Sequence, residues 1–364
     1  MPRTSRVRQR SFASFIVVAM TAALLAGPSQ FAVAAAPWDQ LGVDLDGDAS
    51  NDRAGTSVAL SADGTRMAVG ATRGGVSGGG TGYVRVFEWS GTGWVQLGAD
   101  LEGEGAETGF SVALSGNGNR VAFGARLNSG NGTFAGHARV YDWNGTAWTQ
   151  VGADVDGQAQ FEQIGYSIAL SEDGQDLVVG GVGAASNAGV ARVYNWNGTA
   201  WTQTGADITG DASGDISGSS VAMSANGNRV AVGAPGNDGT GANAGNVRVF
   251  DLSGSTWVQV GSDIDGEAEA DFSGRSVSLS ADGARLAVGA PKNGGGGTEA
   301  GHVRVYQWSG AAWVQLGADL DGQAGGDQAG ASVALSEDGT RVAIGATGAG
   351  AGTVRGGLRR GRRR

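Results

Sequence analysis

Short runs of alternating apolar and polar residues extend along most of the chain and predict β-strands. S-V-A-L-S (57–61), R-M-A-V-G-A (66–71) and V-R-V-F-E-W (84–89) place apolar side chains at every second position. A period of two is typical of strands with at least one buried face. Apolar spacing of the helical kind is absent after the first 35 residues, so we expect an all-β protein.

The strand pattern recurs every 53 to 56 residues, measured between successive copies of W-x-Q-x-G. Self-similarity at this period is typical of propellers and other repeat arrays. Three motifs define six repeats. W-x-Q-x-G begins at Trp38, Trp94, Trp148, Trp201, Trp257 and Trp313; G-x-S-[VI]-x-[LM]-S begins at Gly55, Gly109, Gly165, Gly218, Gly274 and Gly330; G-x-x-R-V-[FY]-x-[WL] begins at Gly82, Gly136, Gly189, Gly245 and Gly301.

Each repeat predicts four strands. Asp63-Gly64 joins the first two as a two-residue type I′ hairpin, because Asp-Gly accepts the positive φ of that turn. S-G-T-G, or N-G-T-A in the next two repeats, joins the third strand to the fourth (94–98) and sets the flanking tryptophans opposite one another. Such aromatic cross-strand pairs stabilise a hairpin. The predicted pairs are Trp89 with Trp94, Trp143 with Trp148, Trp196 with Trp201 and Trp308 with Trp313.

A single repeat cannot bury its own apolar faces. In the first repeat, large residues such as Val58 and Leu60 occupy one face of the strands, and small residues such as Ala59 and Ala68 occupy the other. A large face laid on a neighbour's small face gives sheets buried on both sides, as in propeller blades. We therefore expect a β-propeller of six four-stranded antiparallel blades over residues 36–355. A seven-bladed parent truncated at its end is the alternative.

The ends of the repeat array are irregular. An unpaired fourth strand at 38–41 precedes the first repeat, and we expect it to complete the last blade. The last repeat breaks off after Arg355, where V-[FY]-x-W is missing. Residues 356–364 form an arginine-rich tail, which we expect to be disordered. We interpret the break as a frameshift or fragment end, with a nucleic-acid or membrane tag as the alternative.

The first 35 residues predict export. Basic residues (Arg3 to Arg10), an apolar run (Phe15 to Ala26) and small residues (Ala32 to Ala36) follow in the order of a secretory signal peptide, cleaved after Ala35 or Ala36. The apolar run is too short to span a bilayer. We expect a secreted, extracellular monomer without a membrane span.

Charge narrows the list of partners. Of 25 basic residues, four lie in the predicted signal peptide and six in the last twelve residues, which leaves 15 against 35 acidic residues and a net charge of −20. Such a surface repels nucleic acid, so an extracellular protein or glycan is the expected partner. The chain has no cysteine, so disulfides do not contribute to its stability.

The repeat, read as G-x-S-V-A-L-S, V-G-A-[P] and G-x-V-R-V-Y, resembles the FG-GAP repeats of integrin-alpha-type β-propellers. Gly233-Ala234-Pro235 and Gly289-Ala290-Pro291 match the Gly-Ala-Pro element fully, and the Phe that precedes the first glycine in that family is absent from all six copies. The resemblance implies a propeller with a calcium loop between the first two strands. In this chain the short turn Ala62-Asp63-Gly64 stands at that place.

The crossings between repeats are rich in carboxylates. Alternating carboxylates around a glycine could gather oxygen atoms on Ca²⁺, and the alternative is that they are solvated or cap turns. Ca²⁺ is therefore the cofactor considered, and none is certain. The candidate ligands are Asp44, Asp46, Asp52, Asp154, Asp156, Asp207, Asp211, Asp215, Asp263, Asp265, Asp271, Asp319, Asp321 and Asp327.

Other chemistry is sparse. The histidines His137 and His302 share a repeat position that holds Tyr83, Val190 and Asn246 in other copies, and we interpret them as variants of that position rather than as ligands or bases. A catalytic site needs unique residues, whereas nearly every polar group here is repeated. We therefore expect a non-catalytic binding or scaffold module that engages its partner through the variable loop face. The alternative is a secreted carbohydrate-active hydrolase or lyase with paired carboxylates across the channel mouth.

Overall fold

The structure is a computed structural model that describes residues 40–73, 80–104 and 107–348. The predicted signal peptide (1–35) and arginine-rich tail (356–364) lie outside the described residues. The compact unit that begins at Leu41 contains all the described strands. Within that unit the chain forms one antiparallel sheet per repeat, so the all-β propeller fold is confirmed.

Sheet 1 shows how each repeat is built. It contains β1 (Ala54–Leu60), β2 (Arg66–Ala71), β3 (Tyr83–Trp89), β4 (Trp94–Gln96) and β5 (Leu101–Glu102). The strand order is β1-β2-β3-β4, and β5 also pairs with β3. The predicted fourth strand is thus shorter than expected and is followed by a two-residue strand that the sequence did not predict. Gly98, with φ of 79°, separates the two segments.

Four further sheets repeat this plan. Sheet 2 contains β6 (Thr108–Leu114), β7 (Arg120–Ala125), β8 (His137–Trp143), β9 (Trp148–Gln150) and β10 (Val155–Asp156); sheet 3 contains β11 (Ile164–Leu170), β12 (Asp176–Gly181), β13 (Val190–Trp196), β14 (Trp201–Gln203) and β15 (Ile208–Thr209). Sheet 4 contains β16 (Ser220–Met223), β17 (Arg229–Ala234), β18 (Asn246–Ser253), β19 (Thr256–Gln259) and β20 (Ile264–Asp265); sheet 5 contains β21 (Ser276–Leu279), β22 (Arg285–Ala290), β23 (His302–Trp308), β24 (Trp313–Gln315) and β25 (Leu320–Asp321).

The sixth sheet is described only in part. Its strands β26 (Ala329–Leu335) and β27 (Val342–Ala346) pair as in the other repeats. The positions predicted for its third strand, 352–355, lie outside the described residues. The number of blades therefore stays a prediction.

The turn between the first two strands differs from the prediction. Ser61 N donates to Arg66 O, so the loop holds four residues rather than two. Gly64 N donates to Ser61 O, and within this turn Gly64 alone has a positive φ (70°). A type I turn followed by a left-handed glycine therefore replaces the expected type I′ turn. Asp63 Oδ1 accepts hydrogen bonds from Ser61 Oγ and Thr65 N, which stabilise this four-residue loop.

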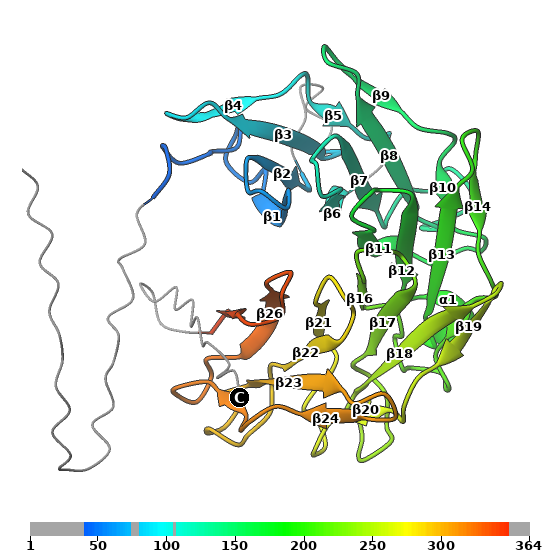
Figure 1. Ribbon diagram of the computed structural model, residues 1–364, viewed down its shortest axis with the longest axis vertical. Helices are drawn as coiled ribbons and strands as arrows, with labels where there is room; N and C mark the ends of the chain where they lie inside the picture. Colours follow the sequence, from blue (N-terminus) through cyan, green and yellow to red (C-terminus); the bar gives the residue numbers. More distant parts are fainter. Residues whose placement is uncertain (1–39, 74–79, 105–106, 349–364) are drawn as a thin grey trace, which may run out of the picture. The chain divides into compact units, whose positions relative to one another are not determined.

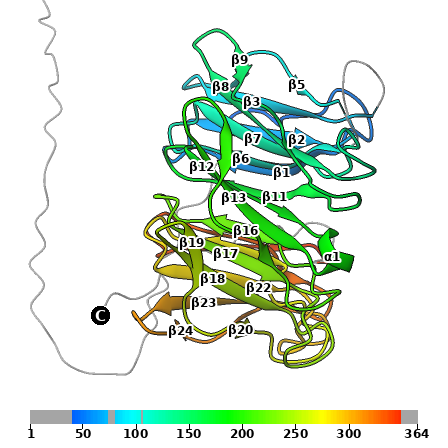
Figure 2. The same cartoon turned by 90° about the vertical axis from the view of Figure 1, so that its right-hand side faces the viewer.

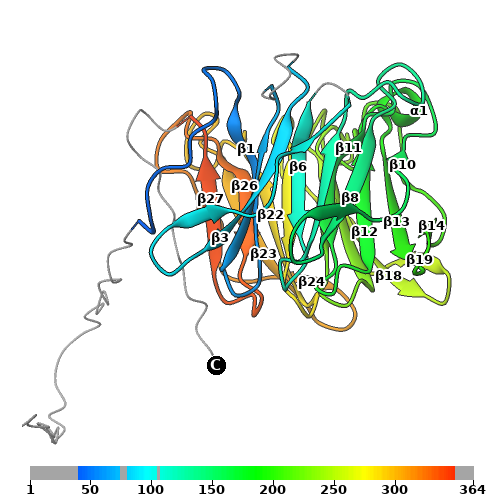
Figure 3. The same cartoon turned by 90° about the horizontal axis from the view of Figure 1, so that it is seen from above.

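The sheets pack large face on small face around a common axis, with the first strand of each sheet innermost (Figure 1). Between sheets 1 and 2, Ala68 and Val84 contact Val112 and Phe123 in one apolar cluster. Successive sheets face one another in Figure 2, and Figure 3 shows β1, β6 and β11 running along the axis. The predicted mode of stacking thus accounts for the core.

The two ends of the axis carry different connections. We call the end with the first-to-second and third-to-fourth turns the turn face, and the end with the longer loops and the crossings between sheets the crossing face. A four-residue helical segment, α1 (Ala184–Asn187), lies in a loop of the crossing face (Figure 3). Ala185 and Ser186 within it have positive φ of 48° and 60°, so it is not a regular helix.

Candidate functional site

A chain of backbone hydrogen bonds links the innermost turns on the turn face. Each link runs from an amide N–H in one sheet to a carbonyl oxygen in the next. The links are Ala62 to Gly116 (2.9 Å), Gly116 to Glu172 (2.7 Å), Glu172 to Ala225 (2.9 Å), Ala225 to Ala281 (2.9 Å) and Ala281 to Glu337 (2.9 Å). These bonds fix the backbone around the mouth of the central channel and hold its side chains at defined positions.

The channel mouth is a pocket of about 200 Å³ to which all six repeats contribute. Each repeat supplies one apolar side chain from the end of its first strand and one residue from the following turn. Only two of the turn residues are ionisable, Glu172 of sheet 3 and Glu337 of sheet 6. The lining residues are Leu60, Ala62, Leu114, Gly116, Leu170, Glu172, Met223, Ala225, Leu279, Ala281, Leu335 and Glu337.

Neither of these carboxylates has a hydrogen-bond or ion-pair partner among the described residues, and both side chains are exposed. They differ in this respect from most acidic residues of the protein, which pair with arginines or accept backbone N–H bonds. An apolar wall with two free carboxylates can bind a small molecule and exchange protons with it.

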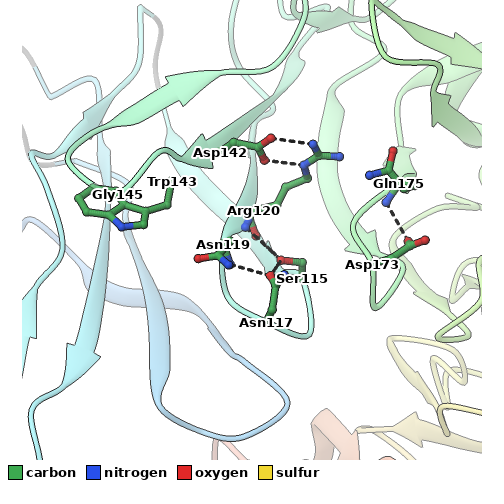
Figure 4. Close-up of a pocket in the computed structure, with 9 residues that line it drawn as sticks. All are labelled: Ser115, Asn117, Asn119, Arg120, Asp142, Trp143, Gly145, Asp173 and Gln175. Atoms are coloured by element: carbon green, nitrogen blue, oxygen red, sulfur yellow. Dashed lines mark hydrogen bonds and ion pairs between the residues drawn. The ribbon is translucent and has the colours of Figure 1, made fainter.

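Two further hollows lie beside Glu172 on the turn face. One, of about 370 Å³, is lined by Asn117, Glu172, Asp173, Ala225 and Asn226. The other, of about 490 Å³, lies between sheets 2 and 3 and shares Asn117 and Asp173 with the first (Figure 4). The lining residues of this larger hollow are Ser115, Asn117, Asn119, Arg120, Asp142, Trp143, Gly145, Asp173 and Gln175.

The one cation of the larger hollow is already paired. Arg120 donates from Nε and Nη2 to the two oxygens of Asp142 (2.6 and 2.7 Å), and its Nη1 donates to Gly174 O (2.8 Å). Figure 4 shows this ion pair beside Asn117 and Asn119. The hollow therefore offers amide and hydroxyl groups rather than a free positive charge, which suits a ligand with many hydroxyl groups better than an anion.

The structure distributes the predicted metal ligands of the crossings over several roles. The last carboxylate of a crossing accepts backbone N–H bonds within its own loop; Asp271 Oδ2, for example, accepts from Glu267 N (3.1 Å) and Ala268 N (3.0 Å). Asp52, Asp215 and Asp327 cap their loops in the same way. These residues are turn caps, as in the alternative weighed from the sequence.

The first carboxylate of most crossings binds the third-strand arginine. Asp154 pairs with Arg139 (2.9 Å), Asp207 with Arg192 (2.9 Å) and Asp319 with Arg304 (3.1 Å). In sheet 4, Asp263 instead accepts from Asn246 and Gln259, and Asp211 pairs with Arg248 (2.9 Å).

The remaining candidates do not meet in one oxygen cage. Asp156, Asp265 and Asp321 end the short strands β10, β20 and β25, and Asp44 and Asp46 are exposed before β1. Calcium binding by these crossings stays a prediction.

Two histidines lie among these carboxylates. Burial, followed by the charge of Arg139, lowers the pKa of His137 to about 4, and burial also lowers the pKa of His302. Burial and the neighbouring Asp154 raise the pKa of Asp156. Both imidazoles are therefore neutral at pH 7.

The paired tryptophans have a second contact besides the cross-strand pair. Trp143 and Trp148 lie opposite one another with ring centroids 5.4 Å apart, and the centroid distances of the other three pairs are 5.3 to 5.5 Å. The second tryptophan also reaches the preceding sheet, since Trp148 Nε1 donates to Leu97 O (2.7 Å). Trp94 makes the same bond to Leu41 O (3.1 Å). Three of the pairs thus contact the preceding sheet, and the first pair contacts the segment before β1, in addition to stabilising their own hairpins.

Comparison with known proteins identifies the fold and no family. No family model and no curated protein matches the chain. Among solved structures, it is similar to hydrazine synthase of Kuenenia stuttgartiensis (16% identity, 85% of this chain and 77% of that chain, TM-score 0.54). It is also similar to a protein named as a candidate 6-phosphogluconolactonase from Bacteroides uniformis (13%, 80% and 77%, 0.55) and to the periplasmic gluconolactonase of Pseudomonas aeruginosa (17%, 79% and 77%, 0.54).

These neighbours correct the functional interpretation of the sequence. We expected a non-catalytic binding module because nearly every polar group is repeated. The neighbours carry the names of enzymes, so catalysis is compatible with this repeated architecture and the expectation of a non-enzyme was wrong. In the described part of the chain, no helix has the length and apolar character that a membrane span requires.

Sequence reasoning also missed the position of the hollows. It favoured the crossing face, whereas the three hollows described above lie on the turn face. One signal was available: the residue after the first-strand serine is Ala or Gly in four repeats and Glu in two, Glu172 and Glu337. A repeat position next to the axis brings all its copies together, so a change of chemistry there marks the channel mouth.

Proposed function

We propose that the protein is an exported hydrolase that opens an uncharged sugar lactone at the channel mouth. The observation that carries the proposal is the pair Glu172 and Glu337, two carboxylates that line one pocket and have no partner among the described residues. The names of two structural neighbours, both lactonases, support lactone chemistry. This proposal sharpens the hydrolase alternative drawn from the sequence.

Lactone hydrolysis needs two proton transfers that carboxyl groups can perform. A carboxylate takes a proton from water while the water oxygen attacks the carbonyl carbon. A carboxylic acid gives a proton to the ring oxygen while the C–O bond breaks, and the product is the open-chain hydroxy acid. We assign one of these transfers to Glu172 and the other to Glu337, and the apolar ends of the first strands line the same pocket.

The hollows beside the channel mouth favour an uncharged substrate over a phosphorylated one. Side-chain amides of Asn117, Asn119 and Gln175, which line the larger hollow, can donate to and accept from sugar hydroxyl groups. The guanidinium of Arg120 is occupied by Asp142, and Glu172 and Asp173 add negative charge. A phosphate group would therefore be repelled.

Export and family membership are proposals as well. The basic, apolar and small segments of the first 36 residues support export, and one neighbour is periplasmic. The G-x-S-V-A-L-S and V-G-A-[P] motifs support relationship to FG-GAP repeat propellers. A monomer that contacts an extracellular glycan fits the acidic surface and the hydroxyl-binding hollow.

The test is a lactonase assay on the full chain. Acid release from gluconolactone is followed by pH-stat at mildly acidic pH, where spontaneous opening is slow, and is compared with release from 6-phosphogluconolactone. We expect Glu172→Ala and Glu337→Ala each to lower kcat by about 10²- to 10⁴-fold. Alanine stands at this position in three other repeats, so both variants should fold.

The matched control is Glu269→Ala, which removes one exposed carboxylate from the crossing face. It should leave the rate unchanged. Absence of lactone hydrolysis by the unmodified protein would overturn the proposed reaction. Full activity in both glutamate variants would overturn the assignment of the site.

A further inference from the structure

Two clusters on the crossing face combine a buried histidine with carboxylates. The His137 cluster contains His137, Asp154 and Asp156, and the His302 cluster contains His302, Asp319 and Glu267. In each cluster, one ligand atom per residue lies within 4.8 Å of the others. The clusters occur in sheets 2 and 5, at the same repeat position.

The register of the strands places an aspartate opposite each histidine. His137 opens β8 directly opposite Asp156 of β10, which belongs to its cluster, and His302 opens β23 directly opposite Asp321 of β25. In the His302 cluster the third ligand is instead Glu267, from the crossing that precedes the sheet. Opposed residues on neighbouring strands have close Cβ atoms, so histidine and carboxylate meet without any special loop. Asp154 and Asp319, which precede β10 and β25, complete the arrangement.

Each histidine has a nitrogen without a partner. His137 is 1% exposed and His302 is 3% exposed, yet His137 Nε2 and His302 Nδ1 have no hydrogen-bond partner in the structure. A buried polar atom without a partner is costly and calls for a specific explanation, such as a bound ion. In the His302 cluster the nitrogen without a partner, Nδ1, lies 3.5 Å from Asp319 Oδ2. In the His137 cluster it is Nδ1 that lies 3.6 Å from Asp154 Oδ2, whereas the nitrogen without a partner is Nε2. Both separations are too long for a good hydrogen bond.

These separations suit ligands that share a metal ion. Ligand atoms bound at about 2.0–2.2 Å to a tetrahedral Zn²⁺ lie roughly 3.3 Å from one another. The aspartates are held in place for this role, because Gln150 Nε2 donates to Asp154 Oδ1 (2.7 Å) and Gln315 Nε2 donates to Asp319 Oδ1 (2.7 Å). In both clusters the other oxygen, Oδ2, faces the imidazole, and it also accepts from an arginine, Arg139 Nη2 (2.9 Å) for Asp154 and Arg304 Nη2 (3.2 Å) for Asp319.

The charge of each cluster matches a divalent cation even though an arginine is present. Around the His137 cluster, Asp154, Asp156 and Glu104 carry three negative charges, and Arg139 carries one positive charge, which leaves two negative charges. Around the His302 cluster, Asp319, Asp271, Asp321 and Glu267 stand against Arg304, so an excess of negative charge remains there as well.

We propose that each of the two histidine–carboxylate clusters binds one divalent transition-metal ion of the zinc type. Imidazole and carboxylate ligands together select such ions over Ca²⁺, which takes oxygen ligands. The sites lie on the crossing face, and their failure or success is independent of the hydrolase proposed at the channel mouth. They also differ from the all-carboxylate calcium loops expected from the sequence.

Sheet 3 is a natural control for both sites. Val190 stands at the histidine position and Thr209 stands opposite it, yet Asp207 still pairs with Arg192 as in the other sheets. The fold thus accommodates a sheet that has neither the imidazole nor the second aspartate at the position of the clusters. Variants that copy sheet 3 should remove metal binding without removing the sheet.

The test is isothermal titration of the metal-free full chain with Zn²⁺, with and without excess Ca²⁺. We expect two equivalents of Zn²⁺ per chain, one in His137→Val, one in His302→Val and none in the double variant, with each site weakened by more than about 100-fold. Excess Ca²⁺ should not compete. Co²⁺ titrated in place of Zn²⁺ should give visible absorption bands that disappear in the double variant.

Two variants leave the histidines intact. Asp156→Thr copies Thr209 and Glu267→Gln copies Gln158, its counterpart in the second repeat. Each should weaken one site and leave the other. A stoichiometry other than two, or two equivalents retained in the double histidine variant, would overturn the proposal.

Discussion

Sheets 1 and 2 face one another across a junction, whereas one face of sheet 1 and one face of sheet 6 have no described neighbour. We call these two faces the edges. The junction and the edges are built from the same repeat positions but differ in burial. Val112 on β6 is 9% exposed, whereas Val58, its counterpart on β1, is 63% exposed. Ala68 on β2 is fully buried, whereas Ala343, its counterpart on β27, is exposed. Burial in this fold is therefore a property of the neighbouring sheet, not of the repeat alone.

Polar contacts show the same difference. At the junction, Ser57 Oγ donates to Gly109 O (2.7 Å) and Arg66 Nη1 donates to Gly118 O (3.2 Å). The counterparts on sheet 6 are Ser332 and Arg341, and within the described residues neither contacts sheet 1. Sheet 6 thus presents donors and small residues, while sheet 1 presents carbonyls and large residues. The two edges are complementary in chemistry, although the described strands do not join them.

The largest expected effect is a difference in the free energy of unfolding between two Leu→Ala variants, one in a junction and one at the edge. Leu286 is fully buried and Leu60 is 59% exposed. Leu286→Ala should lower the free energy of unfolding by about 2–5 kcal/mol, because it removes packed atoms and leaves a cavity. Leu60→Ala should change it by less than about 0.5 kcal/mol. Urea denaturation of both variants measures the difference, and equal losses would show that the edge is covered in solution.

A smaller effect is expected from the arginines that link sheets. Arg229 donates to Gly283 O (2.9 Å) in the next sheet and to both oxygens of Asp251. Arg229→Met should cost about 1–2 kcal/mol, discounted because Asp251 is 37% exposed. Arg341→Met, at the same position of the edge sheet, should cost almost nothing. A clear loss with Arg341→Met in thermal denaturation would contradict an open edge.

The fold could be predicted from the sequence because the pattern of apolar and polar residues is periodic. Alternation fixes which side chains share a face, and the repeat supplies the neighbour that covers that face. The form of the first turn could not be predicted in the same way, because Asp63-Gly64 is compatible with more than one hairpin and the hydrogen bonds of Ser61 decide between them.

The candidate sites were less accessible to sequence reasoning. Asp154 and Asp156 read as equivalent candidates, yet one binds Arg139 and the other lies opposite His137. Only the pairing register of β8 with β10 distinguishes them. The glutamates at the channel mouth were overlooked for a different reason, since a single Glu in a tight turn is usually a solvated residue. Glu172 and Glu337 stand out as candidate site residues only because six turns meet at one axis and bring the two side chains to the same pocket.

The smallest expected effect comes from a hydroxyl group and gives the sharpest comparison, because serine occupies the same position in all six repeats. Ser167 Oγ donates to Gly218 O (2.7 Å) across the junction of sheets 3 and 4. Ser167→Ala should lower the free energy of unfolding by about 1 kcal/mol, the net contribution of one such bond. Ser332→Ala should leave it unchanged while the edge is open. If the two variants lose the same stability, the Ser332 hydroxyl has a partner in solution, and the most direct one is the carbonyl of Gly55 on sheet 1, the counterpart of Gly109.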